Sequence, residues 1–540
     1  MADQDTNLAE QIISQLGRLR GERGTIESHW KEIADRVLPR QSQMFFGQMQ
    51  PGRTKGDKRT TDMLDATAAL GLERFAAVME SMLTPRNSKW HRLQASEPNL
   101  NKSRRVRLWF EELNDALFRA RYSPKANFAG QNHENFIGLG AFGTGCMFID
   151  QNFYETGMRY KAVPLGTCWF EENHQGVVDT VFREFPMTLR QMFQRWPEAM
   201  PDDLRKKMEA KPEQETMVIH CVKPRPQVDH GRSDFRGMPF ISHYIAVESK
   251  ELLSEGGYRT FPYAVSRYVT APGEVYGRSP AMLALPSIKT LNEQKKTVLK
   301  QGHRTVDPVL LAHDDSVVDG FSMTPGALNS GGVNAQGQSM IHTLPIGRVD
   351  IGRDMMNDER AVINDAFLVS LFQILADTPT MTATEVLERT REKGMLLSPT
   401  MGRQQNEYLG PAIEREIDLM TAQGMVPEMP PELLEAEGEY RVEYDSPLSR
   451  AQRAEEASGM FRSLEFATAH ANVSGDVSVF DHFDMDIAVP EVMAINAVPE
   501  RWKRSIEDVA AIREGRAEQA EQQQAVEAAP AIAGLVNAAS

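Results

Sequence analysis

The chain has 540 residues, of which 41% are hydrophobic and 25% are charged, and its formal net charge is −15. This length allows several domains with large cores, and the composition is ordinary for a soluble globular protein. The acidic balance excludes a general basic surface for nucleic acid, and no apolar run approaches the roughly 18 residues of a membrane span.

Helices dominate the first 140 residues. The acidic start, Met1–Asp5, predicts neither a signal peptide nor a transit peptide. Apolar residues at helical spacing, beginning with Leu8, Ile12 and Leu16, predict a first helix that Pro39 ends. The expected elements are a helix at 7–38, a mobile loop at 40–60, a helix at 61–83, a strand at 89–93, and helices at 102–121 and 127–138.

The segment Gly138–Gly143 is a formal match to the glycine fingerprint of dinucleotide-binding proteins. That fingerprint requires a strand before the glycines and a helix after them. Here a helix precedes the glycines and a strand follows, so the order is reversed. We therefore interpret the glycines as a tight turn from a helix into a strand.

Strands dominate residues 145–270, where Val, Ile, Phe and Tyr alternate with Gly and Pro turns. Cys146, Cys168 and Cys221 are widely spaced, which favours reduced, buried thiols over metal ligands. The fold class is therefore α+β. The expected strands are 145–153, 159–163, 167–172, 177–184, 216–223, 240–248 and 258–269, with short helices at 188–196 and 202–210.

Two long helices flank a loop-rich segment in the centre of the chain. Ser279 and Pro280 have the residue types of a helix cap and first turn, and the first of these helices extends to about residue 303. Its lysines alternate with apolar residues. Residues 305–350 are rich in Gly, Pro, Ser and Asn, and a second helix follows over 353–373. Thr382, with Glu385 three residues later, opens a third long helix.

The C-terminal third is helical and charged. A Pro- and Glu-rich joint covers 424–435, and helices are expected at 447–471 and 500–523. Asp481, Asp484 and Asp486 lie close together, but no calcium-loop pattern follows, which favours turn and N-cap roles over metal binding. Residues 524–540 are Ala-rich and of low complexity.

The sequence contains none of the short motifs that carry catalysis. It has no P-loop, no His-Glu-x-x-His, no G-x-S-x-G and no Cys/His cluster at zinc spacing, and its 12 histidines are scattered. The sequence therefore favours a protein that is not an enzyme and that uses no cofactor or metal.

The order of the central helices resembles that of portal proteins, the head-to-tail connecting proteins of short-tailed, podovirus-type bacteriophages. Arg278-Ser279-Pro280 matches the start of that family's first stem helix, and Thr382–Val386 matches the opening of its wing helix. The first helix and the Asp-rich turn before Val498-Pro499 are also similar to the family. The resemblance covers most of the chain.

The resemblance implies a portal fold with a mainly helical wing and stem, an α+β wing insertion, a small clip and a helical crown. The implied parts are the wing at 1–278 with its strand-rich 140–270, a stem helix at 279–304, the clip at 305–350, a second stem helix at 351–373, a tunnel loop at 374–381, a long wing helix at 382–436, the crown at 437–523 and a tail at 524–540.

It also implies a ring, a dodecamer, at one capsid vertex of the virion, assembled in the host cytoplasm. Double-stranded DNA would pass through the ring without sequence-specific contacts during packaging and ejection. The implied partners are the terminase large subunit, a tail adaptor or head-completion protein, and the major capsid and scaffolding proteins, with no membrane. The alternative is a phage-encoded soluble enzyme or scaffold that forms no ring.

Candidate residues follow from this resemblance. The tunnel loop would contact the DNA backbone, and the stem lysines would face either the channel or the carboxylates of a neighbouring copy. A solvated helix face is an equally good interpretation of the lysines. The channel candidates are Lys289, Lys295, Lys296, Lys300, Asp377, Thr378 and Thr380, and the clip candidates for terminase or adaptor contact are His313, Asp314, Asp315, Asn334 and Gln336.

Overall fold

The chain folds into two compact units in the computed structural model, each assembled from separate parts of the sequence. The first combines residues 1–81, 123–386 and 395–419, and the second combines 82–122, 387–394 and 420–540. The structure describes residues 2–45, 56, 63–229, 231–312, 322–330, 332–344, 349–369, 399–435, 438–445, 447–476, 478–495, 498–504 and 508–520.

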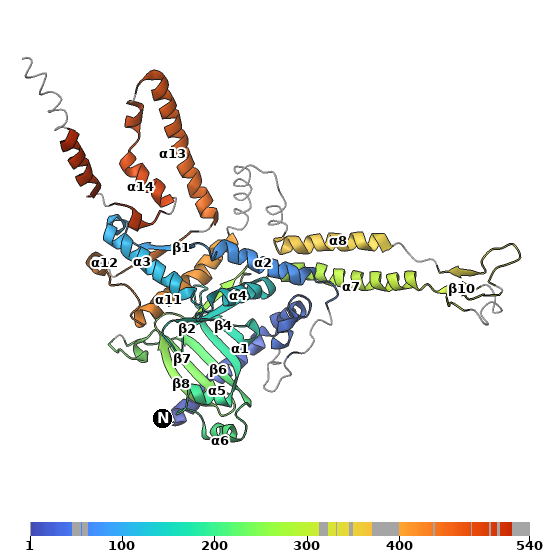
Figure 1. The fold of residues 1–540 in the computed structure, drawn as a ribbon. Coiled ribbons are helices and arrows are strands. Elements are labelled where there is room, and N and C mark those ends of the chain that lie inside the picture. Colours follow the sequence, from blue (N-terminus) through green and yellow to red (C-terminus); the bar gives the residue numbers. More distant parts are fainter. Residues whose placement is uncertain are drawn as a thin grey trace, which may run out of the picture. The chain divides into compact units, whose positions relative to one another are not determined.

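A five-stranded antiparallel sheet is the largest element of the first unit (Figure 1). Its strands follow one another in chain order, and each is paired with the next along the sequence. The strands are β4 (Cys168–Glu172), β5 (Val178–Thr188), β6 (Glu215–Pro224), β7 (Phe240–Ala246) and β8 (Glu251–Tyr258).

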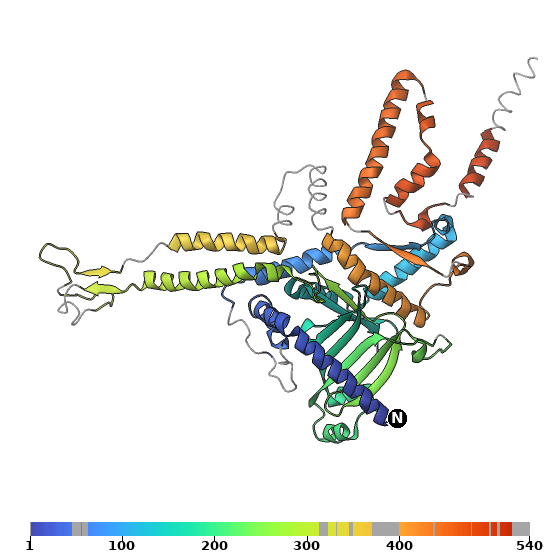
Figure 2. The same ribbon diagram turned by 180° about the vertical axis from the view of Figure 1, so that it is seen from behind.

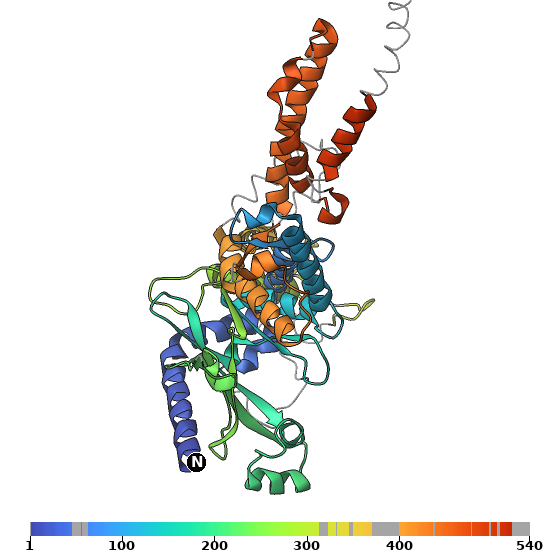
Figure 3. The same ribbon diagram turned by 90° about the vertical axis from the view of Figure 1, so that its left-hand side faces the viewer.

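Helices cover both faces of this sheet. The long helix α1 (Ala2–Val37) lies along one face, as Figure 3 shows, and α5 (Leu189–Arg195) and α6 (Asp202–Ala210) cover the other. Side chains alternate along β6, so that Val218 packs under α5 and α6 whereas Ile219 packs under α1. The α1 side chains in this core are Ala9, Ile12, Leu16 and Leu19.

A second, three-stranded sheet has the order β3-β2-β9. It comprises β2 (Thr144–Gln151), β3 (Met158–Ala162) and β9 (Tyr263–Arg267), and α4 (Phe128–Phe142) packs beside it. A helix over 399–422, which contains a π-helical turn at Gln405–Leu409 and ends as α11 (Gly410–Ala422), is bonded to this sheet. The Tyr160 hydroxyl donates to Glu416 at 2.7 Å, and Arg415 donates to the Ile149 carbonyl at 3.2 Å.

The predicted tight turn after α4 is confirmed. Gly143 ends α4 with a φ of 80°, and a Cβ atom there would lie 2.3 Å from the Gly277 carbonyl oxygen. A Cβ at Gly277 would meet the Gly143 oxygen at 2.2 Å, so both backbones require glycine where they cross. Gly140 faces Leu72 and Phe75 of α2 (Thr67–Leu83). These glycines therefore serve packing between elements.

The second unit is built around one helix and a two-stranded sheet. The helix α3 (Arg104–Arg121) packs on β1 (His91–Ala95), which pairs with β12 (Tyr440–Tyr444). The buried guanidinium of Arg121 lies 4.5 Å from the Trp90 ring and 2.9 Å from His91 Nε2. Also in this unit are α12 (Pro431–Glu435), α13 (Pro447–Ser474), α14 (Met485–Ile495) and a helix over 508–520.

The α+β class predicted from sequence is confirmed, but several elements differ in detail. The strand expected at 258–269 is present but shorter, because β8 ends at Tyr258 and β9 covers only Tyr263–Arg267. Two strands were not predicted from the sequence, namely β8, whose register is set by its pairing with β7, and β12. The helix expected at 500–523 begins instead with a short 3-10 turn at Glu500–Trp502.

Candidate functional site: the paired helices α7 and α8

The helix α7 (Pro280–Val306) begins as the sequence predicts. The Ser279 hydroxyl oxygen accepts from the backbone N–H of Met282 at 2.9 Å, and Pro280 occupies the first turn. The same hydroxyl donates to the Ala141 carbonyl at 2.8 Å, which ties the start of α7 to the end of α4. The residue that caps α7 therefore also connects it to α4.

Burial changes along α7. The buried side chains of α7, which include Leu285, Ile288 and Leu291, all lie in its first half. Beyond Asn292 the side chains of α7 are half-buried or exposed. Leu299 is 49% exposed and Val306 is 88% exposed. The second half of α7 therefore emerges from the core with apolar side chains uncovered.

A buried carboxylate binds side chains of two helices where α7 leaves the core. Asp65 accepts from Lys295 of α7 at 3.3 Å and from Arg360 of α8 (Val349–Ala366) at 2.7 Å. Asn292 accepts the backbone N–H groups of residues 64 and 65. Burial alone would raise the pKa of Asp65, but hydrogen bonds from Thr67 and Arg360 hold this pKa well below its ordinary value. The carboxylate is therefore charged and fastens both helices to one point.

The helices α7 and α8 lie side by side and antiparallel (Figures 1 and 2). They approach closely at Gly352, where an added Cβ would lie 2.8 Å from Val298 Cγ2. Met356 and Ile363 on the inner face of α8 are buried, as is Phe367 just after the helix. The described part of α8 is shorter than the expected 353–373, since the helix ends at Ala366 and Leu368 has a φ of 60°.

A small hairpin lies between the two helices in sequence. β10 (Leu310–Ala312) pairs with β11 (Ile341–Thr343), and the Leu344 N–H donates to the Val309 carbonyl at 2.9 Å. The predicted clip residue Asn334 accepts the backbone N–H groups of Gln336 and Gln338, so its side chain shapes a turn. Gln336 is exposed. The other clip candidates, His313, Asp314 and Asp315, lie outside the described residues.

The four predicted lysines have different environments. Lys289 pairs with Glu32 of α1 at 2.8 Å, and Lys295 pairs with Asp65. Lys296 is exposed and makes a long contact of 3.7 Å with Glu293 one turn away. Lys300 is exposed and has no ion pair within the part of the chain that the structure describes. The loop candidates Asp377, Thr378 and Thr380 lie outside the described residues.

The outer surface of α8 carries charged and apolar residues that were not predicted as functional from the sequence. Asp354, Asp358 and Asp365 are exposed and form no ion pair among the described residues. The missed signal was their spacing of four and seven residues, which places them on one helix face. Apolar side chains that are about half exposed lie on the same helix, namely Ile351, Met355 and Val362.

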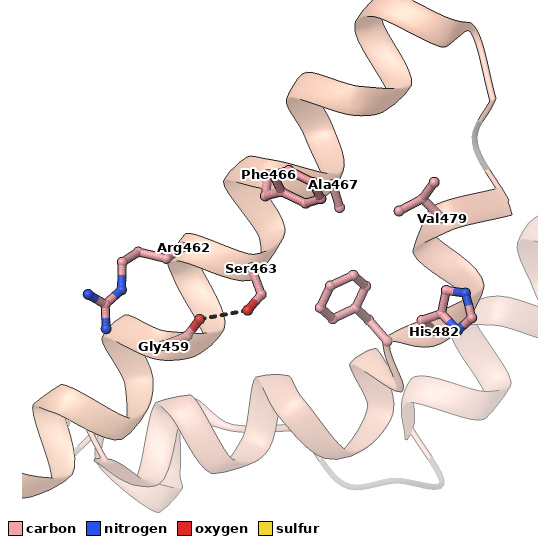
Figure 4. Close-up of a pocket in the computed structure, with 8 residues that line it drawn as sticks. Gly459, Arg462, Ser463, Phe466, Ala467, Val479 and His482 are labelled. Carbon is pink, nitrogen blue, oxygen red and sulfur yellow. Dashed lines mark hydrogen bonds between the residues drawn. The ribbon is translucent and has the colours of Figure 1, made fainter.

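Two hollows lie in the second unit. One, of about 590 Å³, lies between β1, α3 and residues 498–501, and its charged side chains largely pair with one another, as in Arg107–Glu500 at 3.0 Å. The other, of about 530 Å³, is an open groove between α13 and the turn before α14 (Figure 4). Phe466, Ala467 and Val479 line the groove, and it holds no converging set of acid, base and nucleophile.

Other polar groups also have structural roles. Cys146, Cys168 and Cys221 are buried and free, which confirms the sequence prediction. The ring of His220 lies between the hydroxyls of Tyr263 and Ser242, at 2.7 and 3.0 Å, and burial keeps the pKa of His220 well below its ordinary value. Asp484 accepts the N–H groups of residues 486 and 487, which confirms its predicted capping role.

Metal-binding clusters and membrane-spanning helices are both absent from the residues that the structure describes. His, Cys, Asp and Glu side chains do not gather there in any group of three or more suited to a metal ion. Within the same residues, every helix is too short or too polar to cross a bilayer.

Comparisons with known proteins give a consistent result. Residues 9–502 match the model of the family described as bacteriophage head to tail connecting protein. The chain is 28% identical over 526 residues to the portal protein of Salmonella phage epsilon15, covering 96% of this chain and 92% of the relative. It is 31% identical over 484 residues to the probable portal protein of Bordetella phage BPP-1, covering 88% of this chain and 85% of the relative.

Proposed function

Because the chain belongs to the bacteriophage head to tail connecting protein family, we propose that it forms the portal ring at one capsid vertex, through which the genome is packaged and ejected. Membership of this family makes it a structural protein of the virion and not an enzyme. The observation that carries the ring proposal is the pair α7–α8, whose outer surfaces expose apolar and charged side chains beyond the buried core.

The exposed apolar side chains support self-assembly. Leu299, Ile351, Met355 and Val362 are each about half exposed on two adjacent helices. Several uncovered apolar side chains on neighbouring elements are typical of a surface that another protein covers. A ring of copies related by rotation buries such surfaces at a head-to-tail interface that closes on itself. We infer a dodecamer from the family resemblance.

In this proposal each part of the chain has the role that the family resemblance implies. The pair α7–α8 forms the stem around the channel, and residues 305–350 form the clip, which docks first the terminase large subunit and then the tail adaptor. The wing at 1–278 and 382–436 and the crown at 437–523 meet the major capsid and scaffolding proteins. The net charge of −15 favours free passage of DNA, because like charges repel.

Particle mass tests the ring. We expect the purified chain, alone or expressed with its scaffolding protein, to form particles of many copies with a central hole in negative stain. Mass photometry gives the copy number as the ratio to the monomer mass of 60.6 kDa. A chain that stays monomeric under both conditions would contradict the proposal and favour the alternative of a soluble scaffold.

The tunnel loop at 374–381 has its own test. We propose that this loop contacts the DNA backbone inside the channel without reading its sequence. Deleting the loop, or the substitution Thr378→Pro, is expected to leave ring assembly intact and to reduce the DNA that packaged heads retain. Rings are counted in negative stain and retained DNA is measured by nuclease protection. Normal retention in heads that carry the altered loop would refute its role.

A further inference from the structure

The outer faces of α7 and α8 carry stripes of opposite charge. On α7, Lys289, Lys296, Lys300 and Arg304 are exposed and are separated by seven, four and four residues. With about 3.6 residues per turn, these separations place them along one side of the helix, which we call the basic stripe. On α8 the exposed carboxylates form the acidic stripe, which consists of Asp350, Asp354, Asp358 and Asp365.

The two stripes point away from each other within one chain. Val298 marks the side of α7 that faces α8, because it meets Gly352 there. Lys296 and Lys300 are each two residues from Val298, and two residues turn a helix by about 200°, so both lie on the far side of α7. Asp350 and Asp354 are likewise each two residues from Gly352. The helix pair therefore has one basic outer edge and one acidic outer edge.

The spacing of the two stripes also matches. Taken from the C-terminal end of α8, the acidic residues are separated by seven, four and four residues, as the basic residues are along α7. When the two patterns are aligned, Lys289 pairs with Asp365, Lys296 with Asp358, and Lys300 with Asp354. The Val298–Gly352 contact inside one chain instead places Lys300 level with Asp350, so this alignment is shifted from it by four residues, which is about one helical turn.

We propose that the basic stripe of one copy binds the acidic stripe of the next copy around the ring. The inference rests on the ring proposed above and identifies which surfaces join its subunits. Copies of a closed ring are related by rotation without a rise along the axis, so residues at equal heights in one chain meet at equal heights between chains. The charge pattern therefore fits α7 of one copy beside α8 of its neighbour.

The stripes form few ion pairs within the described part of their own chain, which supports a second copy of the chain as their partner. Lys300, Arg304, Asp354, Asp358 and Asp365 form no ion pair within the described ranges. Lys289 has one exposed partner, and Lys296 makes only the long contact with Glu293. An isolated exposed ion pair contributes little, but a row of pairs in register steers association and selects the partner. A second copy of this chain carries the complementary row.

A mixing experiment with two variants of the full chain tests the proposal. Lys296→Glu with Lys300→Glu makes both outer edges acidic, and Asp354→Lys with Asp358→Lys makes both edges basic. Each variant alone is expected to lose the ring particle in mass photometry and to remain folded by circular dichroism. An equimolar mixture is expected to recover rings, because every junction then joins an acidic edge to a basic edge. A single chain with all four substitutions should also recover rings.

Matched controls separate the stripes from net charge. Lys206→Glu with Lys211→Glu, and Glu198→Lys with Glu209→Lys, change the net charge by the same amounts at exposed positions on or beside α6. These controls are expected to form rings as the wild type does. If either stripe variant alone forms wild-type rings, or if the mixture fails to recover them, the proposal is overturned while the portal function stands.

A cross-link gives an independent measurement. Lys300→Cys with Asp354→Cys, treated with a short bismaleimide, is expected to produce a ladder of covalent multimers on a denaturing gel. The native cysteines are buried, so they add little background. If assembled rings of this variant give only monomers on the denaturing gel after the same treatment, the proposal is contradicted. The variant with Lys296→Glu and Lys300→Glu could also form wild-type rings while heads built with it retain less DNA. That result would instead assign the basic stripe to the channel.

Discussion

At the scale of single residues, Asp65 is the side chain on which the start of the exposed helix pair depends. It is nearly buried and joins the segment before α2 to Lys295 of α7 and Arg360 of α8. Its carboxylate also accepts from the Thr67 N–H at 3.0 Å, which begins α2. One residue thus fixes three helices, so its removal affects all of them.

The substitution Asp65→Asn is expected to lower the free energy of unfolding by about 1–3 kcal/mol at pH 7, because two partly buried cations lose their counter-charge. The pKa of Asp65 is lowered by folding, so this stabilisation is complete above its unfolded value of about 4 and is lost as the pH falls through the lower folded value. The gap between wild type and variant in urea unfolding should therefore be constant from pH 7 to 5 and shrink in acid. Glu32→Gln, which breaks the exposed pair with Lys289, is the control and should cost at most about 1 kcal/mol.

Gly143 and Gly277 permit a second prediction at this scale. Gly143→Ala is expected to destabilise the protein by at least about 2 kcal/mol, because the residue has a positive φ and its new methyl would meet the Gly277 carbonyl. Gly21→Ala in α1, where nothing lies within 4 Å of the added methyl, is the matched control and should stabilise by about 0.5–1 kcal/mol. Chemical unfolding measures both. Equal effects of the two substitutions would contradict our account of the glycines.

The role of a single residue could be predicted where it depends on residues nearby in the sequence. The cap at Ser279 and the turn at Gly143 depend on residues close in sequence, and both were predicted correctly. The partners of Lys289 and Lys295 were not predictable, because Glu32 and Asp65 are more than 200 positions away in the chain. Long-range ion pairs leave no periodic signal in a single sequence.

At the scale of elements, the contact of α8 with α7 depends on Gly352. Gly352→Ala gains about 0.5–1 kcal/mol of helix propensity but pushes a methyl into the stiff Val298 side chain, which costs about 1–3 kcal/mol. We expect a net loss of stability by thermal unfolding. Adding Val298→Ala is expected to restore the gain, and Gly302→Ala on α7, which has open space around it, should stabilise without a second change. A stabilising Gly352→Ala alone would show that the helices separate easily.

Long helices with a clear apolar period were the most predictable elements. α1, α3 and α7 lie close to their predicted ranges because one apolar face defines each of them. β8 and β12 were missed for a tertiary reason. β8 contains two glycines and has weak strand propensity, and it is a strand because β7 offers a free edge. β12 pairs with β1, about 350 residues earlier, so its partner is invisible to local patterns.

At the scale of the whole molecule, we expect the proposed clip to be removable without loss of the rest of the fold. The described ends of this segment lie side by side, since the Leu344 N–H donates to the Val309 carbonyl. Deleting residues 310–345 is expected to leave rings of normal size in negative stain and to abolish binding of the ATP-hydrolysing terminase in a pull-down. DNA packaging by the deleted ring at normal yield would show that the clip lies elsewhere in the chain.

The family and the fold class could be predicted from the sequence, whereas the division into two compact units could not. Residues 82–122 join the C-terminal region because β1 pairs with β12 and Arg107 pairs with Glu500. The implied wing at 1–278 therefore contributes a segment to both units. A division of the chain into consecutive domains cannot describe units that are each assembled from separate segments.

The opposite charges on the two outer edges of the α7–α8 pair have an arithmetical consequence for a ring assembled from the two reversed variants. Their members must alternate strictly, because neither variant tolerates its own kind as a neighbour. Such a circle closes without a mismatched seam only when the number of members is even. The yield of closed particles from the mixture, compared with that of the wild type, would therefore report the parity of the assembly.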